Sequence, residues 1–351
     1  MYTLMIGNGF DLAHKLPTKY RHFMDFLNWC YFTNYEDTFE ADNLLNGFNI
    51  KLKDYIKSNV NNEDIILSHT KEMVMNFGNN KWYEFFYKIM NEGKCIGEDW
   101  VDFESLIAAV IRNLEKEPDD QFSAMIDDNM RKDMLYNLVF HEHAEYDYKI
   151  IRPLILELRK ELDDFIKCLD EYITIIDKLA IDDSDKLNCI KNIDFDYVIS
   201  FNYSNVFEEH YKRASHPIIY IHGKAGEAEQ EDISNLVLGC EETLPKEKSD
   251  IDMRCGYFKK YIQREVKNTA RGYRVCESSK AGEDGFLYII GHSLDVNDGD
   301  IIKYLIEHHK YVNIFYYDID DCIKKNQNLV RILTKEGYEK LKWKINYKKL
   351  Y

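Results

Sequence analysis

The feature that most constrains the fold is a set of short apolar runs, each followed by glycine or a polar residue. The runs cover residues 2–6, 195–201, 218–221, 236–238, 286–290 and 311–317, and they are rich in Ile, Val, Tyr and Phe. Several are apolar at successive positions, which is typical of a parallel strand that is covered on both faces. The sequence therefore predicts an α/β fold built on a parallel sheet.

Helical periodicity fills the space between the first run and the others. It is clearest over residues 153–180, where Pro153 suits a first helical turn and Leu154, Leu158, Leu162 and Phe165 follow at three- and four-residue steps. Such a helix would be about 42 Å long at 1.5 Å per residue. We expect a sheet-centred core of residues 1–20 and 190–351, with residues 21–189 as a large helical insertion after the first strand and helix.

Charge and cysteine usage limit the partners and the compartment. The chain has 46 Lys and Arg against 62 Asp and Glu, so its formal charge of −16 predicts repulsion from nucleic acid over most of the surface. It contains no apolar run of 18 residues and no leader of the secretory type, so no membrane partner is expected. The eight cysteines include no Cys-x-x-Cys pair. This predicts no zinc site of the ribbon type and a reducing, cytoplasmic location.

Five of the runs deliver polar residues or glycine to what would be one edge of the sheet. In open parallel sheets ligands bind at the carboxyl ends of the strands. The candidate binding residues are Gly7, Asn8, Gly9, Phe10, Asp11, Ser200, Asn202, His222, Gly223, Gly291, His292, Ser293, Leu294 and Asp318. Gly-x-Gly before a helix lets a phosphate approach the backbone, and Asp318 offers a carboxylate to ribose hydroxyls. Each also has a structural interpretation: tight turns for the glycines, helix capping for Asn202 or Ser204, and packing for His222.

The same residues form a recognisable set of motifs. The segment Gly7-Asn8-Gly9-Phe10-Asp11-Leu12-Ala13-His14, followed by Leu16-Pro17-Thr18 and Tyr20, resembles the AbiH family of bacterial abortive phage-infection proteins. The later motifs of that family are matched, in order, by Trp100-Val101-Asp102-Phe103-Glu104, Phe201-Asn202-Tyr203, Ile221-His222-Gly223 and Gly291-His292-Ser293-Leu294-Asp295.

The AbiH family in turn resembles the sirtuin-like fold, a Rossmann-type architecture that binds NAD. The resemblance implies that Gly7-Asn8-Gly9 forms the glycine turn of the nucleotide site and Gly291-His292-Ser293-Leu294 its nucleotide loop. It also implies that Asn202 is the NAD-contacting asparagine and His222 the catalytic histidine. The four zinc cysteines of sirtuins are missing, which disfavours protein deacylation. Asp11 replaces a serine, so we expect it to face a ribose, cap its helix or meet a cation.

The leading functional prediction is an antiphage effector that hydrolyses NAD at the nicotinamide–ribose bond. NAD would be the substrate and not a true cofactor, with no metal required. His222 would act as base toward water or a ribose hydroxyl, and Asn202 would orient the reacting group. One alternative is a metal-dependent nuclease or phosphodiesterase, with Asp11, Asp102 and Glu104 around Mg²⁺. Another is a non-catalytic sensor of NAD or ADP-ribose.

Regulation follows from the same hypothesis. An NAD-consuming enzyme that is always active would kill its host, so we expect an off-state held by homo-oligomer contacts or a ligand and released by a phage-derived trigger. The tail at 335–351 is basic, with six lysines. A basic tail on an acidic protein can contact a neighbouring subunit, but we expect this one to be solvated.

Overall fold

The computed structural model describes residues 1–35, 38–59, 65–77, 80–91, 103–115, 148–211, 214–230, 233–241, 254–274 and 285–351. Within these ranges, six strands form one parallel sheet in the order β3-β2-β1-β6-β7-β8. The strands are β1 (Tyr2–Ile6), β2 (Tyr197–Ser200), β3 (Ile219–Tyr220), β6 (Phe286–Ile290), β7 (Tyr311–Tyr316) and β8 (Ile345–Lys349). The predicted α/β class with a parallel sheet is confirmed.

The register of the three central strands brings their carboxyl ends level. Ile6 lies opposite Ser200 of β2 and Ile290 of β6. The backbone N–H of Phe201 donates to the Ile6 carbonyl at 2.9 Å, and that of Gly7 donates to the Ile290 carbonyl at 3.1 Å. The polar and glycine residues that follow these strands therefore leave the sheet at one edge.

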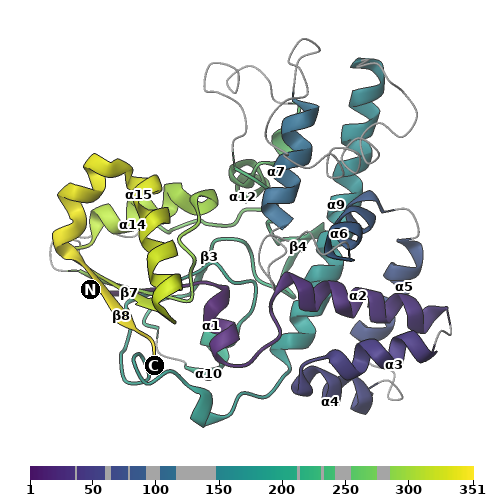
Figure 1. Cartoon of the computed structure of the whole chain (residues 1–351), viewed down its shortest axis with the longest axis horizontal. Coiled ribbons are helices and arrows are strands. Elements are labelled where there is room, and N and C mark those ends of the chain that lie inside the picture. Colours follow the sequence, from purple (N-terminus) through teal and green to yellow (C-terminus); the bar gives the residue numbers. More distant parts are fainter. Residues whose placement is uncertain are drawn as a thin grey trace.

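Helices cover both faces of the sheet, as a parallel sheet requires. On one face, Met5, Ile199 and Ile289 pack against α14 (Gly299–His308) and α15 (Ile319–Leu341). On the other face, Leu4 and Val198 belong to a larger apolar cluster that includes α1 (Asn8–Ala13), α10 (Val206–His210) and the inserted helices. Figure 1 shows α14 and α15 at one side of the molecule and the inserted helices at the other.

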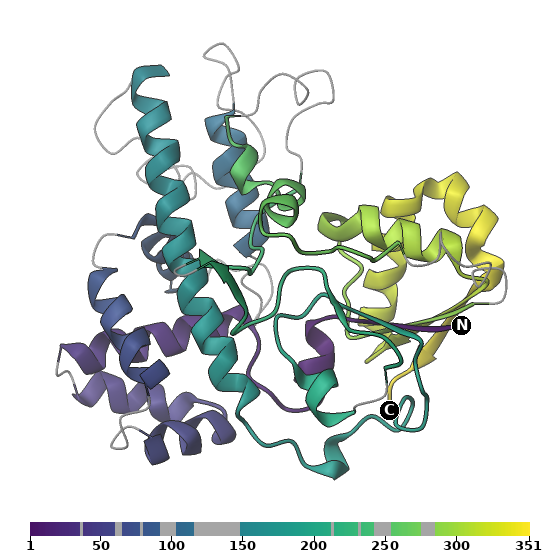
Figure 2. The same cartoon turned by 180° about the vertical axis from the view of Figure 1, so that it is seen from behind.

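Helices occupy the described parts of the segment between α1 and β2. They are α2 (Tyr20–Asn34), α3 (Thr38–Gly47), α4 (Ile50–Asn59), α5 (Ile65–Asn76), α6 (Lys81–Asn91), α7 (Phe103–Leu114) and α9 (Tyr148–Asp177). The longest, α9, runs through the insertion toward the sheet (Figure 2). It begins before Pro153, which therefore lies inside the helix and removes one backbone donor from its ladder. The predicted apolar face, from Leu158 to Ile176, is buried.

The expectation of a strand at 236–238 is wrong. Leu236, Val237 and Leu238 are buried, which explains their apolar character, but they form no ladder. Their N–H groups donate to three unrelated acceptors: the Ser234 hydroxyl, the His222 carbonyl and the Gln263 side chain. The residues follow β5 (Ile233–Ser234), which pairs with β4 (Ala228–Gln230) in a separate antiparallel ribbon. An apolar run indicates burial. Strand pairing also requires a neighbouring backbone segment with which a ladder can form.

The basic tail is not simply solvated. Residues 345–349 form β8, which pairs with β7 over five positions from Ile345 to Lys349. Ile345 is buried, whereas Lys348 and Lys349 are exposed along the outer edge. Lysines on an edge strand hinder further strand addition, so the charge that predicted a free tail instead protects the edge of the sheet.

No helix in the described part of the chain is both long and apolar enough to cross a membrane.

Candidate active site

Two glycine turns at the carboxyl edge of the sheet pack directly on each other. The backbone N–H of Gly9 donates to the Gly291 carbonyl at 2.7 Å. Gly291 has φ +69°, and a Cβ on it would lie 2.0 Å from the Phe10 nitrogen; a Cβ on Gly9 would lie 2.8 Å from the Gly291 Cα. The close backbone contact leaves no room for a side chain at either glycine. The Gly9 N–H is already hydrogen-bonded within the protein.

Asp11, on α1, anchors two polar residues that follow β2. Its carboxylate accepts hydrogen bonds from Asn202 Nδ2 at 2.9 Å and from Ser204 Oγ at 2.6 Å. Burial raises the pKa of Asp11 to about 7, and the two hydrogen bonds oppose this in part. Asp11 therefore positions Asn202 and Ser204, a role that none of the three expectations from the sequence included. Neither of those residues caps α10, whose N-cap is Asn205.

The hydrogen bond to Asp11 fixes the orientation of the Asn202 amide. Because Nδ2 donates to the carboxylate, Oδ1 points elsewhere, and this buried oxygen has no hydrogen-bond partner. The adjoining backbone is also held, since Asn202 N donates to Ser200 Oγ at 3.1 Å. Ser200 and Asp11 thus support an amide that presents one unused acceptor. A buried polar atom without a partner is unusual and is a candidate contact for a ligand.

His222 follows β3 and is oriented by a carboxylate. Its Nε2 lies 3.1 Å from Asp298 Oδ1, and both side chains are buried. Burial lowers the pKa of His222 to about 4, although Asp298 opposes the shift, so the imidazole is neutral at pH 7. The carboxylate requires a donor, which assigns the proton to Nε2 and leaves Nδ1 as an acceptor. Nδ1 is buried and has no hydrogen-bond partner.

Asp298 is the buried centre of an ion-pair cluster. Lys260 Nζ lies 3.1 Å from Asp298 Oδ1 and 2.7 Å from Glu104 Oε2 of α7. Arg264 Nη2 approaches the same Asp298 oxygen at 3.6 Å, and its Nη1 hydrogen-bonds Asp300 at 3.1 Å. Lys260 and Arg264 both lie on α12 (Lys260–Val266). The cluster therefore connects His222 to α12 and to the inserted helix α7.

His292, which follows β6, joins the same group. Its Nε2 lies 3.8 Å from Asp298 Oδ2, and its Nδ1 accepts the backbone N–H of Leu294 at 2.9 Å. Burial lowers the pKa of His292 to about 4. The Phe201 ring packs edge-on against both imidazoles, with centroids 5.5 Å from His222 and 4.4 Å from His292. Residues after β2, β3 and β6 thus meet at the carboxyl edge of the sheet.

Other predicted binding residues serve the fold. Phe10 is fully buried beside His14 and Tyr211, and Leu294 is fully buried with φ +56°. Asn8 donates from Nδ2 to the Thr18 carbonyl at 3.0 Å. The carbonyl of Ser293 accepts a hydrogen bond from Asn328 at 3.2 Å.

Asp318 lies apart from the other candidates. Its carboxylate accepts the Asp321 N–H at 2.8 Å and so caps α15, and the residue is exposed. No contact joins Asp318 to Asn202 or His222 in the described structure, so its predicted contact with a ribose has no support from geometry.

The sequence missed Asp298, Lys260 and Arg264. Asp298 follows the Gly-His-Ser-Leu motif by four residues and immediately precedes α14, where an acidic residue is usually a cap. Lys260 and Arg264 stand in an ordinary polar helix pattern that follows none of the predicted strands. Their burial in the structure is what identifies them as candidate functional residues, because lysine and arginine are almost never fully buried without partners.

The carboxylates proposed for a metal site are engaged elsewhere. Asp11 is hydrogen-bonded to Asn202 and Ser204, and Glu104 is paired with Lys260. Asp102 lies outside the described residues. No group of three or more His, Cys, Asp or Glu in the ranges that the structure describes is arranged to hold a metal ion.

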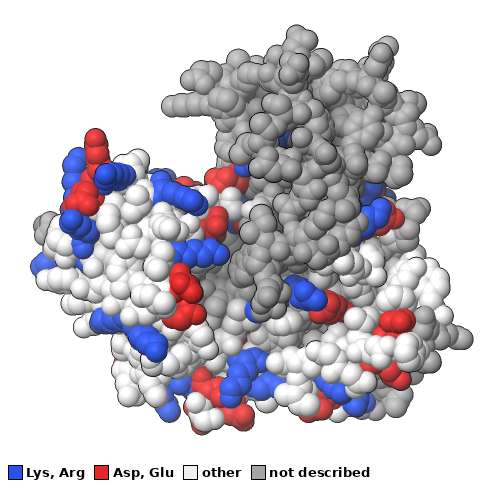
Figure 3. All heavy atoms as spheres, viewed as in Figure 1, with Lys and Arg blue, Asp and Glu red and all other residues white. Residues whose placement is uncertain are grey.

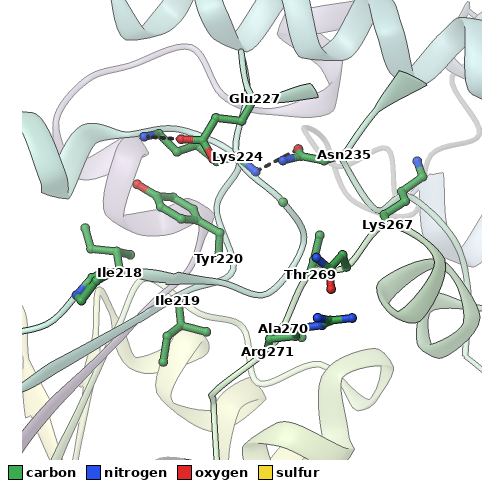
Figure 4. Close-up of a pocket in the computed structure, with 13 residues that line it drawn as sticks. Ile218, Ile219, Tyr220, Lys224, Glu227, Asn235, Lys267, Thr269, Ala270 and Arg271 are labelled. Atoms are coloured by element: carbon green, nitrogen blue, oxygen red, sulfur yellow. Dashed lines mark hydrogen bonds and ion pairs between the residues drawn. The ribbon is translucent and has the colours of Figure 1, made fainter. Parts of the chain in front are cut away.

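A cavity of about 450 Å³ lies at the outer side of β3. It is lined by Tyr220 and Gly223, by Lys224 and Glu227, which form an ion pair at 3.0 Å, and by the segment 267–271. Gly223 has φ +82°, and a Cβ there would lie 2.3 Å from the Asn235 carbonyl oxygen. Figure 4 shows Tyr220 and the Lys224–Glu227 pair opposite Thr269, Ala270 and Arg271. The volume suits a small ligand, and the lining includes the residue after His222 but not His222 itself.

Charge on the described part of the face in Figure 3 is mixed. Basic and acidic side chains are interspersed, and neither sign covers the surface. Such a pattern lacks the basic stripe by which nucleic-acid-binding proteins neutralise phosphates.

The family model described as "Bacteriophage abortive infection AbiH" matches residues 3–336. The chain belongs to the AbiH family. Membership indicates a role in abortive infection, a form of antiviral defence against bacteriophage. The match spans β1, the helical insertion and the ion-pair cluster, so the site described above lies within the family region. No curated protein and no solved structure matches the chain.

Proposed function

We propose that this AbiH protein cleaves NAD at the nicotinamide–ribose bond during phage infection, with His222 as base. The observation that carries the proposal is the buried His222–Asp298 pair, whose free Nδ1 is a neutral acceptor with no protein partner. A carboxylate that holds one imidazole nitrogen leaves the other ready to take a proton from water or a hydroxyl.

The second unused acceptor supports a ligand that brings hydrogen-bond donors. Asn202 Oδ1 accepts nothing from the protein, and the Asn202 amide is held in place by Asp11. A ribose diol supplies hydroxyl donors, whereas an unprotonated phosphate supplies none. We therefore assign Asn202 and His222 to the ribose and the attacking water, with no phosphate between them.

The charge of the cluster supports the chemistry of bond cleavage. The carboxylates of Glu104, Asp298 and Asp300 outnumber the cations of Lys260 and Arg264. Cleavage of the glycosidic bond develops positive charge on the ribose, as in glycoside hydrolysis. A surplus of negative charge stabilises that centre, and nicotinamide leaves as a neutral ring without a general acid.

The test is release of nicotinamide from NAD by purified protein and by extracts of phage-challenged cells that express it. We expect His222→Ala and Asn202→Ala each to lower the rate by about 10²-fold or more. His216→Ala is the matched control, because His216 is exposed and remote from Asp298. Unchanged NAD levels in challenged cells, or full activity in both variants, would refute the assignment. Parallel incubations with DNA and RNA, with and without EDTA, test the metal-dependent nuclease.

A second function, a non-catalytic sensor of NAD or ADP-ribose, is favoured by one observation. The lowered pKa of His222, about 4, makes it a weak base at pH 7. Ligand that binds through Asn202 and is recovered intact after long incubation would support the sensor over the hydrolase.

The regulatory part of the proposal is an inactive homo-oligomer in the cytoplasm that a phage-derived trigger activates. Light scattering of the purified protein before and after addition of phage lysate tests it. A monomer under both conditions would overturn the oligomeric off-state.

A further inference from the structure

A continuous chain of charges runs from the helical insertion to His222, and it is buried from Lys260 onward. It starts at Glu104 on α7, passes through Lys260 on α12, and reaches Asp298, which holds His222 Nε2. The successive distances are 2.7, 3.1 and 3.1 Å. Lys260 is 1% exposed, so water screens these contacts poorly.

Lys260 is shared between two carboxylates, and this sharing couples them. A buried ammonium that moves closer to Glu104 neutralises Asp298 less, and the reverse also holds. Asp298 in turn is the carboxylate that stabilises the protonated form of His222. The position of α7 therefore determines how much negative charge His222 experiences.

We propose that Glu104 and Lys260 are positioning residues that couple the helical insertion to His222 through Asp298. Neither residue touches the unused Nδ1 atom. A displacement of α7 on activation would change both the orientation and the basicity of His222 without moving the sheet. The functional consequence rests on the proposed role of His222 as base, whereas the coupling itself does not.

The direction of the effect depends on every charge that faces His222. Asp298 favours its protonated form, and Lys260 and Arg264 disfavour it. His292 shares Asp298, while Glu241 and Asp300 lie against Arg264. Removal of Lys260 leaves Asp298 less neutralised, so the pKa of His222 rises. Removal of the Glu104 charge alone lets Lys260 neutralise Asp298 more completely, so the pKa of His222 falls further.

The experiment is an NMR pH titration of the histidine ring signals of the full-length protein, with the His222 signal assigned by its loss in His222→Gln. Lys260→Met alone removes the ammonium that Glu104 and Asp298 share and risks unfolding. The double variant Glu104→Gln/Lys260→Met also removes the Glu104 charge, so that only Asp298 loses this partner, and Asp298 keeps Arg264 and His222 beside it. We expect it to raise the pKa of His222 by at least one unit, and Glu104→Gln alone to shift it in the opposite direction.

A neighbouring ion pair provides the matched control. Lys259 Nζ lies 2.9 Å from Glu115 Oε1, is equally buried, and joins the residue after α7 to the residue before α12. Glu115→Gln/Lys259→Met should cost similar stability and leave the pKa of His222 unchanged. Equal pKa values of His222 in wild type and Glu104→Gln/Lys260→Met, or the same shift in the control, would overturn the coupling.

The same variants separate the coupling from the proposed activity. If the protein cleaves NAD, the acid limb of its pH–rate profile should move to higher pH by the shift measured in Glu104→Gln/Lys260→Met. A lower rate at all pH values, with no movement of that limb, would indicate a structural role only. If NAD is not cleaved and His222 still titrates as expected, the proposed function fails and the coupling stands.

Discussion

Burial makes Asp11 a weaker acid than an exposed aspartate. Its two hydrogen bonds, from Asn202 and Ser204, compensate only part of the cost of burial, and its pKa rises from 3.8 to about 7. An acid whose pKa is higher in the folded than in the unfolded state stabilises the fold at low pH and loses that contribution as pH rises.

The pH dependence of stability tests this directly. Between about pH 4 and pH 7 the unfolded chain ionises Asp11 while the folded chain does not, so the free energy of unfolding falls by at most about 4 kcal/mol. In Asp11→Asn this contribution is absent. Urea denaturation at pH 4.5 and pH 8 should show a smaller loss of stability for Asp11→Asn than for wild type. Equal losses in the two proteins would contradict the buried, protonated state of Asp11.

Gly291 is predicted to tolerate no side chain. Because its φ is +69° and a Cβ would lie 2.0 Å from the Phe10 nitrogen, Gly291→Ala must separate the two strand ends. We expect a loss of about 3 kcal/mol or more in the free energy of unfolding. Gly47→Ala is the control, since a Cβ there meets nothing within 4 Å and should change stability by less than about 1 kcal/mol. Thermal denaturation of both variants provides the comparison.

At the residue scale, strand ends that carry polar residues are visible in the sequence, whereas the partners of those residues are not. His222 and His292 both approach Asp298 because they follow strands whose ends are level. Asp298 and Lys260 were missed because their roles come from contacts between segments far apart in the chain. Asp318 caps α15, a role that the sequence does not distinguish from ligand binding because a carboxylate after a strand can serve in either.

At the scale of elements, the insertion is attached to the core by specific buried hydrogen bonds. Tyr172, near the carboxyl end of α9, donates from its hydroxyl to the Pro17 carbonyl at 2.6 Å, and Tyr172 is fully buried. Pro17 lies in the connection between α1 and α2. This contact fixes the angle at which the insertion leaves the core.

Tyr172→Phe should therefore destabilise the protein although it preserves the ring. The Pro17 carbonyl would remain buried without its donor, which costs about 1–3 kcal/mol. Tyr35→Phe serves as the control, because Tyr35 is 60% exposed. Urea denaturation that gives equal midpoints for the two variants would show that Pro17 does not depend on this hydrogen bond.

The elements that the sequence predicted best are those with strong periodicity. The strands β1, β6 and β7 and the long helix α9 follow from apolar runs and from three- and four-residue spacing. The segment 236–238 failed because burial alone does not supply a neighbouring strand. The strand β8 was missed because its four polar or charged positions conceal the single buried residue, Ile345, and only pairing with β7 makes it a strand.

At the scale of the whole molecule, the insertion and the sheet share one apolar cluster. Leu4 and Val198 of the sheet belong to the same group of contacts as Phe165 and Ile176 of α9. A continuous core of this kind favours a single cooperative unfolding transition, because neither part can unfold without exposing the other.

Cysteine labelling tests this cooperativity. Cys30 and Cys168 lie in the insertion, Cys240 and Cys255 lie near the site, and all four are buried free thiols. Burial raises the pKa of Cys30 and Cys168 above the ordinary range, so they should react only after unfolding. Pulsed alkylation across a urea gradient, mapped by mass spectrometry, should give the same midpoint for all four. Separate midpoints for the two pairs would indicate independent units.

The position of β1 determines when the molecule becomes complete during synthesis. The ribosome releases β1 first, yet its two neighbours in the sheet are β2 and β6, and the contact between Gly9 and Gly291 needs a residue near the end of the chain. At about 5–20 residues per second, the turn at Gly9 is synthesised on the order of tens of seconds before Gly291. A chain that ends before Asp298 cannot assemble the cluster around it. Under the proposed function, such unfinished copies lack the His222–Asp298 pair on which cleavage would depend.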